Sequence, residues 1–396
     1  MKKGWQTKTL GEVLEKTETV NPLQSPNTEF DYIDVSSVSN TTFEIEETQR
    51  LKGKDAPSRA RKLVRTNDII FATIRPTLQR IAVVPGHLDK QVCSTGYFVL
   101  RPKQGIDHRF VFYSLFTENF IGQMESLQKG ASYPAVTDGD VRAQEIPVPP
   151  LAEQQRIVDL LDEAFEGLAT AKDNAEKNLQ NACALFESHL QSVFTQRGQG
   201  WANRQLASLC HEITVGHVGS MKTEYKESGI PFLRSQNIRP FEVSMENAMF
   251  IDESFHRALK KSQLRPGDLA IVRTGYPGTA AVIPPELPDS NCSDLVIVRP
   301  SKEVNPHFLA AFFNSAFGKQ LVLGKIVGAA QKHFNITAAK EVMLHVPPIA
   351  EQRTIVAMVD DLRDETQRLA HLYERKLAAL EALKKSLLHQ AFTGAL

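Results

Sequence analysis

The chain repeats itself at an interval of about half its length, and this repeat limits the folds that it can adopt. Residues 149–158 (PPLAEQQRIV) recur as residues 347–356 (PPIAEQRTIV), so that Ala152 and Ala350 are 198 positions apart. The match extends outward, since Trp5 corresponds to Trp201 and Cys93 to Cys292 at similar offsets. Self-similarity at a fixed interval indicates a duplicated structural unit. We therefore expect two similar lobes, each followed by the same kind of helix.

Each copy of the repeat opens a long segment with helical spacing. Apolar residues recur every three or four positions at Ile157, Leu161, Ala164, Leu168, Ala171, Ala175, Leu179, Ala182, Phe186, Leu190 and Val193, and again at Ile355, Val359, Leu362, Thr366, Leu369, Tyr373, Leu377, Leu380, Leu383, Leu387 and Ala391. This pattern predicts two helices of about 45 residues, each roughly 65 Å long, with a coiled-coil seam. Neither seam is stable in water, so we expect the helices to pack antiparallel against each other.

The lobes have a different pattern, of short β-branched and aromatic runs separated by turn residues. Strands are predicted near 30–35, 69–72, 81–84 and 97–100, and helical patches at 109–123 and 306–323. The predicted fold class is α+β: two similar mixed α/β domains joined by two long antiparallel helices, with pseudo-two-fold symmetry. The expected boundaries are 1–150 and 198–348 for the domains, and 151–197 and 349–396 for the helices.

Composition excludes several classes of protein. The 396 residues contain no run of about 18 apolar residues, and no apolar stretch follows the N-terminal lysines, so we expect a cytoplasmic protein without a membrane span. The four cysteines form no Cys-x-x-Cys pair, which argues against disulfides and zinc. Cys210, His211 and His217 are expected to be structural, and no metal site is predicted.

The sequence also lacks the motifs of the common nucleotide-dependent enzymes. Gly318-Lys319 lacks the first glycine and the Ser/Thr of a phosphate-binding loop. Asn21-Pro22 and Asn305-Pro306 lack the second proline and the aromatic residue of an amino-methyltransferase motif, and Pro288-Asp289 lacks a nearby nuclease Glu-x-Lys. We therefore predict that this chain has no active site and is not an enzyme.

Basic and amide side chains gather in loops of both lobes, although the 46 basic and 46 acidic residues cancel overall. Arginine can pair with guanine and Gln or Asn with adenine, while lysine mostly contacts phosphate. The candidate DNA-binding residues are Arg59, Arg61, Lys62, Arg75, Gln79, Arg80, Lys129, Ser132 and Tyr133 in the first lobe, and Arg234, Gln236, Asn237, Arg273, Tyr276, Gln331, Lys332 and His333 in the second. The alternative for any single one of these loops is a solvated charged surface.

The duplicated Pro-Pro-Leu/Ile-Ala-Glu-Gln motif at the head of a long helix, with a Trp-x-x-x-x-Leu segment near each lobe's start, resembles the specificity subunits of type I restriction-modification systems. The resemblance covers essentially the whole chain. It implies that each lobe is a target recognition domain and that the helices are conserved spacer regions. The implied partners are double-stranded DNA, two methyltransferase subunits and motor-nuclease restriction subunits. S-adenosylmethionine, ATP and Mg²⁺ would then belong to the partners, with no cofactor in this chain.

Two alternatives remain open from the sequence. Glu153, Gln154, Glu351 and Gln352 either cap their helices or contact a partner subunit. The whole chain is either a subunit that recognises a two-part DNA sequence with an unspecified spacer, or a scaffold or regulator of the same complex that has lost DNA recognition. The zero net charge favours the second reading, because phosphate contacts normally dominate DNA affinity.

Overall fold

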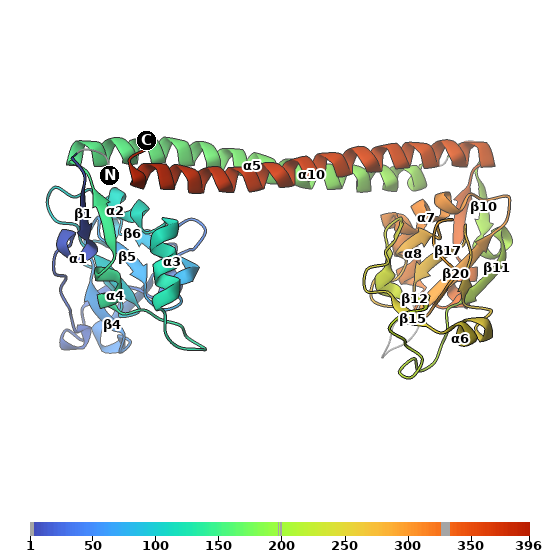
Figure 1. Cartoon of the computed structure of the whole chain (residues 1–396), viewed down its shortest axis with the longest axis horizontal. Helices are drawn as coiled ribbons and strands as arrows, with labels where there is room; N and C mark the ends of the chain where they lie inside the picture. The colour runs from blue at the N-terminus through green and yellow to red at the C-terminus, as the bar shows by residue number, and fades with distance from the viewer. Residues whose placement is uncertain (1–3, 197, 199, 326–332) are drawn as a thin grey trace. The chain divides into compact units, whose positions relative to one another are not determined.

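The computed structural model describes residues 4–196, 198, 200–325 and 333–396. The chain divides into two compact units, residues 1–175 with 375–396, and residues 176–374. Each unit contains one lobe and one segment of each long helix, because α5 (Leu151–Thr195) and α10 (Ile349–Thr393) are both cut by the division. We call residues 4–150 lobe one and residues 200–348 lobe two (Figure 1).

Lobe one is built from short strands with a few helices. Its strands are β1 (Gln6–Thr9), β2 (Glu29–Ile33), β3 (Gln49–Lys52), β4 (Ala60–Leu63), β5 (Ile69–Ala72), β6 (Ile81–Val83), β7 (Val92–Ser94), β8 (Tyr97–Leu100) and β9 (Glu145–Val148). Its α-helices are α1 (Leu10–Val13), α2 (His108–Ser114), α3 (Glu118–Leu127) and α4 (Asp138–Arg142). Single turns of 3₁₀-helix are η1 (Pro22–Gln24), η2 (Val35–Ser37), η3 (Gly53–Asp55), η4 (Pro76–Leu78) and η5 (Gly86–Leu88).

Lobe two repeats this order with small additions. Its strands are β10 (Ala202–Gln205), β11 (Cys210–Val215), β12 (Ile230–Leu233), β13 (Ile238–Arg239), β14 (Glu242–Val243), β15 (Met249–Ile251), β16 (Gln263–Leu264), β17 (Leu269–Val272), β18 (Ala280–Val282), β19 (Ser290–Cys292), β20 (Leu295–Pro300) and β21 (Met343–Val346). Its helices are α6 (Glu253–Ala258), α7 (Pro306–Asn314), α8 (Ala316–Gly324) and α9 (Ile336–Lys340), with 3₁₀ turns η6 (Leu206–Leu209) and η7 (Ser235–Asn237).

The two lobes share sheet topology and register. One sheet has the order β3-β2-β7-β4 in lobe one and β15-β12-β19-β16 in lobe two. A second has the order β6-β5-β8 in lobe one and β18-β17-β20-β11 in lobe two, and the pairs β1-β9 and β10-β21 form a two-stranded sheet in each lobe. The parallel strand pair aligns Ile33 with Cys93 in the first lobe and Leu233 with Cys292 in the second. The central strands β5 and β17 are buried along their whole length, as expected for β-branched and aromatic runs covered on both faces. Cys93 and Cys292, two of the four free cysteines, are therefore small core residues at equivalent positions of the two lobes.

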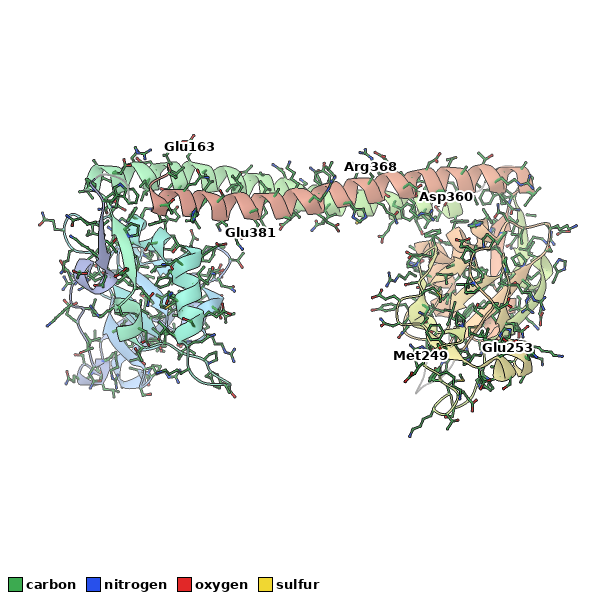
Figure 2. The ribbon with its side chains drawn as sticks, in the orientation of Figure 1. Glu163, Met249, Glu253, Asp360, Arg368 and Glu381 are labelled. Atoms are coloured by element: carbon green, nitrogen blue, oxygen red, sulfur yellow. The ribbon has the colours of Figure 1, made fainter. Side chains whose placement is uncertain are left out.

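The two long helices start where the repeat predicts, directly after Pro149-Pro150 and Pro347-Pro348. In the first unit, Ile157 and Leu161 of α5 pack with Leu388 and Ala391 of α10, so the start of one helix meets the end of the other. In the second unit, the end of α5 and the start of α10 share the core of lobe two. The helix segments are thus antiparallel within each unit. Charged side chains such as Glu163, Arg368 and Glu381 project from the outer faces (Figure 2).

The predicted seam has one error. All the other predicted seam positions are buried or half-buried, but Leu383 is 47% exposed. Next to it, the half-buried Lys384 holds its ammonium over the rings of Phe43 and Phe165. A seven-residue repeat does not match the roughly 3.6 residues per turn of a straight helix, so the repeated positions rotate slowly around the helix. Near the end of α10 the inward-facing position is therefore one residue later than predicted, at Lys384 rather than Leu383.

The predicted helical patches are each two helices rather than one. The 109–123 patch is divided into α2 and α3, and the 306–323 patch into α7 and α8. Thr117 accepts a hydrogen bond from the backbone N–H of Phe120, and Ser315 accepts one from that of Gly318, so each hydroxyl caps a new helix. The apolar periodicity continues across the break, which is why it does not reveal the break. Among the described helices, none combines the length and apolar character needed to cross a bilayer.

Candidate nucleic-acid interface

Four loop segments converge at one edge of the sheets in lobe one. Thr73, after β5, donates from its backbone N–H and its hydroxyl to the carbonyl of Gly96, at 2.9 and 3.0 Å. The same β5–β6 loop pairs with the segment after α3, where Arg75 N–H donates to the Pro134 carbonyl at 2.7 Å. At the end of this loop, the Arg80 guanidinium donates hydrogen bonds to the carbonyls of Val35 and Val38, in and next to η2. We call residues 35–38, 73–80, 95–96 and 129–135 loop cluster one.

Loop cluster one brings together several predicted DNA-binding residues that are distant in sequence. The Arg75 guanidinium lies 5.2 Å from the centre of the Tyr133 ring and donates to the Ser132 carbonyl at 3.3 Å. The Tyr133 ring is 72% exposed, and Lys129, Ser132 and Arg75 are exposed with it. Arg75 and Gln79 flank η4 in left-handed conformations, with φ of 50° and 53°. A stacked Arg–Tyr pair on an exposed, strained loop is suited to contact bases or phosphates.

Three of the predicted basic residues are tied into the lobe itself. The Lys62 ammonium donates to the Tyr97 carbonyl at 2.6 Å and pairs with Asp138 at 2.8 Å. The Arg80 guanidinium donates to carbonyls of the η2 segment, among them Val38. Arg61 donates to the carbonyl of Ala60. Arg59 is exposed, and its backbone carbonyl accepts a hydrogen bond from Thr95 N–H. Lys62 and Arg80 therefore hold the loops in place, and a contact of either with DNA stays a prediction.

Lobe two has an equivalent loop cluster, centred on Asp294 between β19 and β20. The Asp294 carboxylate accepts hydrogen bonds from the hydroxyls of Ser235 and Thr274, which join η7 to the β17–β18 loop. The backbone of Arg273 donates to the Asp294 carbonyl and accepts from Phe334 N–H at 3.2 Å. We call residues 234–237, 273–279, 293–294 and 333–334 loop cluster two. The sequence analysis did not identify Asp294 as a residue of this site. The only feature of the sequence that could have pointed to it is its position two residues after the repeated Cys292.

The predicted residues of lobe two differ in how they are placed. The Tyr276 side chain is 85% exposed at the tip of the β17–β18 loop. Gln236 and Arg234 both donate to the carbonyl of Asn247. The Nε atoms of Arg234 and Arg273 are buried and have no hydrogen-bond partner among the described residues. His333 lies at the edge of the cluster, while Gln331 and Lys332 fall outside the described residues.

Asn237 does not fit the expected contact with adenine. It is fully buried, its amide donates to the carbonyls of Ser244 and Glu246 at 3.0 Å each, and its side-chain oxygen accepts from Arg234 N–H. A side chain with every polar atom bound inside the lobe cannot reach a base edge without breaking the loop. This corrects the sequence-based expectation for Asn237, which shapes the loop instead.

The glutamines of the repeated motif form a latch between helix and lobe. Gln154, 1% exposed, accepts from Asp107 N–H at 2.8 Å and donates to the carbonyls of Gly105 and Pro149. Gln352, fully buried, accepts from Asn305 N–H at 2.7 Å and donates to the carbonyls of Glu303 and Pro347. Asp107 and Asn305 are the residues that cap α2 and α7. Burial leaves neither glutamine available to a partner subunit, which corrects that expectation for these two residues.

The glutamates of the motif are half-buried at the starts of the long helices. Glu351 accepts a hydrogen bond from the Trp201 indole at 2.8 Å. Glu153 pairs with Arg156, which also donates to the Leu396 carbonyl at 3.0 Å. Arg156 therefore joins the start of α5 to the end of the described chain. A contact of Glu153 or Glu351 with a partner stays a prediction.

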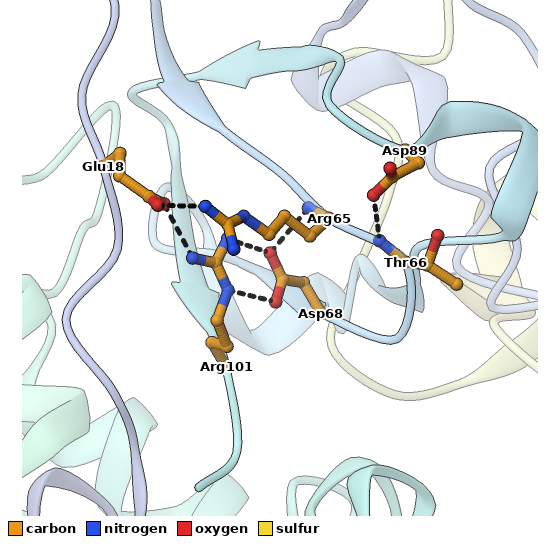
Figure 3. Close-up of polar contacts among 6 residues, drawn as sticks. All are labelled: Glu18, Arg65, Thr66, Asp68, Asp89 and Arg101. Carbon is orange, nitrogen blue, oxygen red and sulfur yellow. Dashed lines mark hydrogen bonds and ion pairs between the residues drawn. The ribbon is translucent and has the colours of Figure 1, made fainter.

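Each lobe also contains an acid–arginine–acid cluster in which the arginine and the aspartate are buried and the glutamate is exposed. In lobe one, Arg101 binds Asp68 through two hydrogen bonds of 2.8 and 2.9 Å and Glu18 through one of 2.6 Å (Figure 3). These carboxylates raise the pKa of Arg101 above its usual range, and the hydrogen bond from Arg101 lowers the pKa of Glu18. Arg299 pairs with Asp268 and Glu212 in lobe two. Arg101 and Arg299 occupy equivalent positions in the two copies, each directly before a proline.

The chemistry of the loop clusters suits binding rather than catalysis. They contain arginine, amide, hydroxyl and tyrosine groups, and among the described residues no group of three or more His, Cys, Asp and Glu side chains could hold a metal ion. The lobes are equivalent in framework, yet the stacked Arg75–Tyr133 pair of one and the Asp294-centred loops of the other present different surfaces. Two related scaffolds with different exposed loops define a class of two-site recognition proteins.

Comparison with known proteins identifies the family. A family model described as "Type I restriction modification DNA specificity domain" matches residues 2–179 and again 199–376. The chain belongs to this family, and the resemblance inferred from the sequence is confirmed.

Individual relatives agree with the family model. The EcoKI specificity subunit of Escherichia coli K12 is 24% identical over 331 residues, covering 77% of this chain and 69% of the relative. The HindI specificity subunit of Haemophilus influenzae is 30% identical over 165 residues, covering 40% and 34%. A chain from a solved structure on complex assembly and conformational transition of the type I R-M system has a TM-score of 0.86 at 29% identity, covering 100% of this chain and 99% of its own. The HsdS subunit of Thermoanaerobacter tengcongensis has a TM-score of 0.72 at 29% identity, covering 100% and 98%.

Proposed function

We propose that this chain is the DNA sequence-specificity subunit of a type I restriction-modification complex. It recognises a two-part DNA sequence with an unspecified spacer and directs adenine methylation and restriction by its partners. The observation that carries this proposal is the pair of loop clusters, which occupy equivalent positions in the two lobes but present different side chains. A duplicated framework with divergent loops is what recognition of two different half-sites requires.

Within loop cluster one, Arg75 is the best candidate for base recognition. Its guanidinium is exposed and oriented by the Tyr133 ring and the Ser132 carbonyl, which leaves further N–H donors for a guanine edge. In loop cluster two, the buried Nε atoms of Arg234 and Arg273 retain unused donors beside exposed Gln236 and Tyr276. We expect the exposed Gln236 and Tyr276 side chains to make the first contacts of this cluster with DNA.

The chemistry of the complex belongs to partner subunits in this proposal. Two methyltransferase subunits would supply the S-adenosylmethionine site and flip the target adenine, and restriction subunits would use ATP and Mg²⁺. The chain itself would hold no cofactor and catalyse no reaction. The names of the EcoKI and HindI relatives, both specificity subunits of type I restriction enzymes, support this division of labour.

Arg75→Ala and Tyr133→Ala should each weaken recognition of one half-site by about tenfold, because a good bidentate base contact contributes about 1–3 kcal/mol. The measurement is methylation of the cognate duplex by the complex reconstituted with its methyltransferase subunits, after sequencing of methylated adenines has identified the site. Arg257→Ala is the matched control, since Arg257 is an exposed, ion-paired arginine on α6 outside both loop clusters. Unchanged methylation in both loop variants would remove loop cluster one from the proposal.

The zero net charge favours one competing function, a scaffold or regulator without DNA recognition. The two functions differ in the salt dependence of DNA binding by the reconstituted complex. Recognition through Arg75 predicts that the slope of log K against log salt becomes shallower in Arg75→Ala, if the guanidinium also neutralises a phosphate. A complex whose DNA affinity is unaffected by substitution in either loop cluster would support the scaffold.

A further inference from the structure

Each lobe contains a short hairpin that connects its loop cluster to the long helices of the same unit. In lobe one, η2 leads into residues 38–45, where Val38 and Ile45 form a β-bridge and Ser39 N–H donates to the Glu44 carbonyl at 3.0 Å. In lobe two, η7 leads into the β13–β14 hairpin, where Arg239 lies opposite Glu242 in the antiparallel strand pair. A phenylalanine, Phe43 or Phe241, lies at the turn of each hairpin.

Both phenylalanines adopt a left-handed backbone conformation. The φ angles are 58° for Phe43 and 67° for Phe241, and the two residues are 198 positions apart, like the helix motifs. A bulky residue is rare in this region, and glycine or asparagine is the usual choice at such a turn. Strain that occurs at the same place in both copies indicates that the ring is needed there.

Both rings lie against a cation of α10, while their relation to α5 differs between the units. Phe43 lies 5.3 Å from the Lys384 ammonium of α10, which is also 5.5 Å from the ring of Phe165 on α5. Phe241 lies 5.4 Å from the Arg363 guanidinium of α10 and 5.9 Å from the ring of Phe186 on α5. In each unit a hairpin phenylalanine therefore lies against a cation of α10. In the first unit that cation also lies against Phe165 of α5, and in the second unit the phenylalanine itself packs on Phe186 of α5.

These helix residues are not copies of one another. By the repeat, Phe165 occupies the position of Arg363, and Phe186 the position of Lys384. The first helix thus has aromatic residues where the second has cations. The contacts are complementary only when α5 pairs with α10, because two copies of α10 would bring Lys384 close to Arg363.

The other end of each hairpin is held by its loop cluster. The Arg80 guanidinium donates to the Val38 carbonyl, and the buried Asn237 amide donates to the carbonyls of Ser244 and Glu246. A shift of the hairpin relative to the helices would therefore move η2 or η7 with it. Loop position is coupled to the helices through a few named contacts.

We propose that Phe43 and Phe241, with Lys384 and Arg363, are positioning residues that fix each loop cluster relative to the helix segments of its own unit. Through that orientation they make the complex discriminate the length of the unspecified spacer. This inference rests on the proposed function.

The test compares methylation rates on duplexes that carry the native spacer or a spacer one base pair longer or shorter. The complex is reconstituted with its methyltransferase subunits and contains Lys384→Met, Arg363→Met, Phe43→Leu or Phe241→Leu. Lys384→Met keeps the aliphatic packing and removes the cation. Lys384→Arg is the conservative variant, and Lys376→Met, at an exposed position of α10, is the matched control.

The Met and Leu variants should lower the ratio of native to altered-spacer rates by about threefold to tenfold, since a partly desolvated cation–π contact has that strength. Lys384→Arg should retain the wild-type ratio, as should Lys376→Met, with complex assembly and thermal melting unchanged. A wild-type ratio in Lys384→Met and Phe43→Leu would overturn the inference while leaving the proposed function intact. A wild-type complex that methylates without sequence dependence would overturn both.

Discussion

Single buried amides connect the long helices to the lobes. Gln154 and Gln352 each make three hydrogen bonds to backbone atoms of their lobe and its junction with the helix. Their neighbours Gln155 and Arg353 are exposed, so the repeat conserves the inward-facing residue of the pair. From the sequence we expected these glutamines either to cap their helices or to contact a partner subunit. The structure shows a third role, in which they attach each lobe to its long helix.

Gln154→Ala should destabilise the first unit by about 2–3 kcal/mol, because the Asp107 N–H and two carbonyls would lose buried partners. Gln352→Ala should have a similar effect on the second unit. Thermal or urea unfolding of the whole chain measures the change, and Gln155→Ala, which alters an exposed side chain one position away, should leave stability within about 0.5 kcal/mol. Equal melting temperatures of Gln154→Ala and Gln155→Ala would contradict the stabilising role of the buried Gln154 hydrogen bonds.

Glu18 should make the stability of lobe one depend on pH. Its pKa is lowered, first by the hydrogen bond from Arg101, so its contribution is present above the ordinary glutamate pKa and is lost as pH falls through the lowered value. Wild type should therefore be more stable than Glu18→Gln at neutral pH, and the difference should shrink below about pH 4. Unfolding midpoints at several pH values test this, with Glu47→Gln, an exposed glutamate outside the cluster, as control. A difference that persists unchanged at pH 3 would contradict the assignment.

At the scale of elements, the sequence predicted the long helices and four strands of lobe one, but it did not predict the other strands or the division of the helical patches. The runs at 69–72 and 97–100 are strands β5 and β8, because buried β-branched and aromatic residues suit a sheet covered on both faces. The division of the 306–323 patch comes from the Ser315 cap and from the close approach of Gly318 to the Phe312 backbone, neither of which interrupts the apolar periodicity. The stacking of Arg75 on Tyr133 likewise joins segments far apart in sequence, so the candidate residues could be named but not grouped.

Gly318 should be indispensable to the tight connection between α7 and α8. A Cβ atom there would lie 2.0 Å from the backbone carbonyl oxygen of Phe312. Gly318→Ala should therefore cost roughly 2–4 kcal/mol in unit two, comparable to other severe packing defects. Gly122→Ala in α3 is the matched control, because a Cβ there meets nothing within 4 Å and alanine favours a helix by up to about 1 kcal/mol. Calorimetry of both variants measures this effect. A Gly318→Ala melting temperature equal to that of wild type would contradict the argument.

At the scale of the whole molecule, neither half of the chain contains a complete unit. The first unit needs residues 375–396, and the second needs residues 176–195 of α5. Leu388 and Ala391 are buried against Ile157 and Leu161, so a chain ending at residue 197 would expose an apolar seam. The repeat thus describes two lobes but not two independent domains.

Fragments 1–197 and 198–396 should therefore be poorly soluble when expressed alone and should copurify when expressed together. An affinity tag on the first fragment, followed by measurement of the second in the eluate, tests this. Leu161→Asp in the first fragment should abolish copurification, because it places a carboxylate in the buried seam, and Glu163→Gln on the outer face should not. A first fragment that is soluble and monomeric by itself would contradict the shared core.

The glutamine latch has a consequence for how such proteins diversify. Its lobe-side partners are main-chain atoms, the N–H of Asp107 and the carbonyl of Gly105 in one lobe, and the N–H of Asn305 and the carbonyl of Glu303 in the other. Main-chain groups are present whatever the side chain. A lobe can therefore change its exposed residues freely over evolutionary time and remain attached to the same helix, provided that the turn before α2 or α7 keeps its shape.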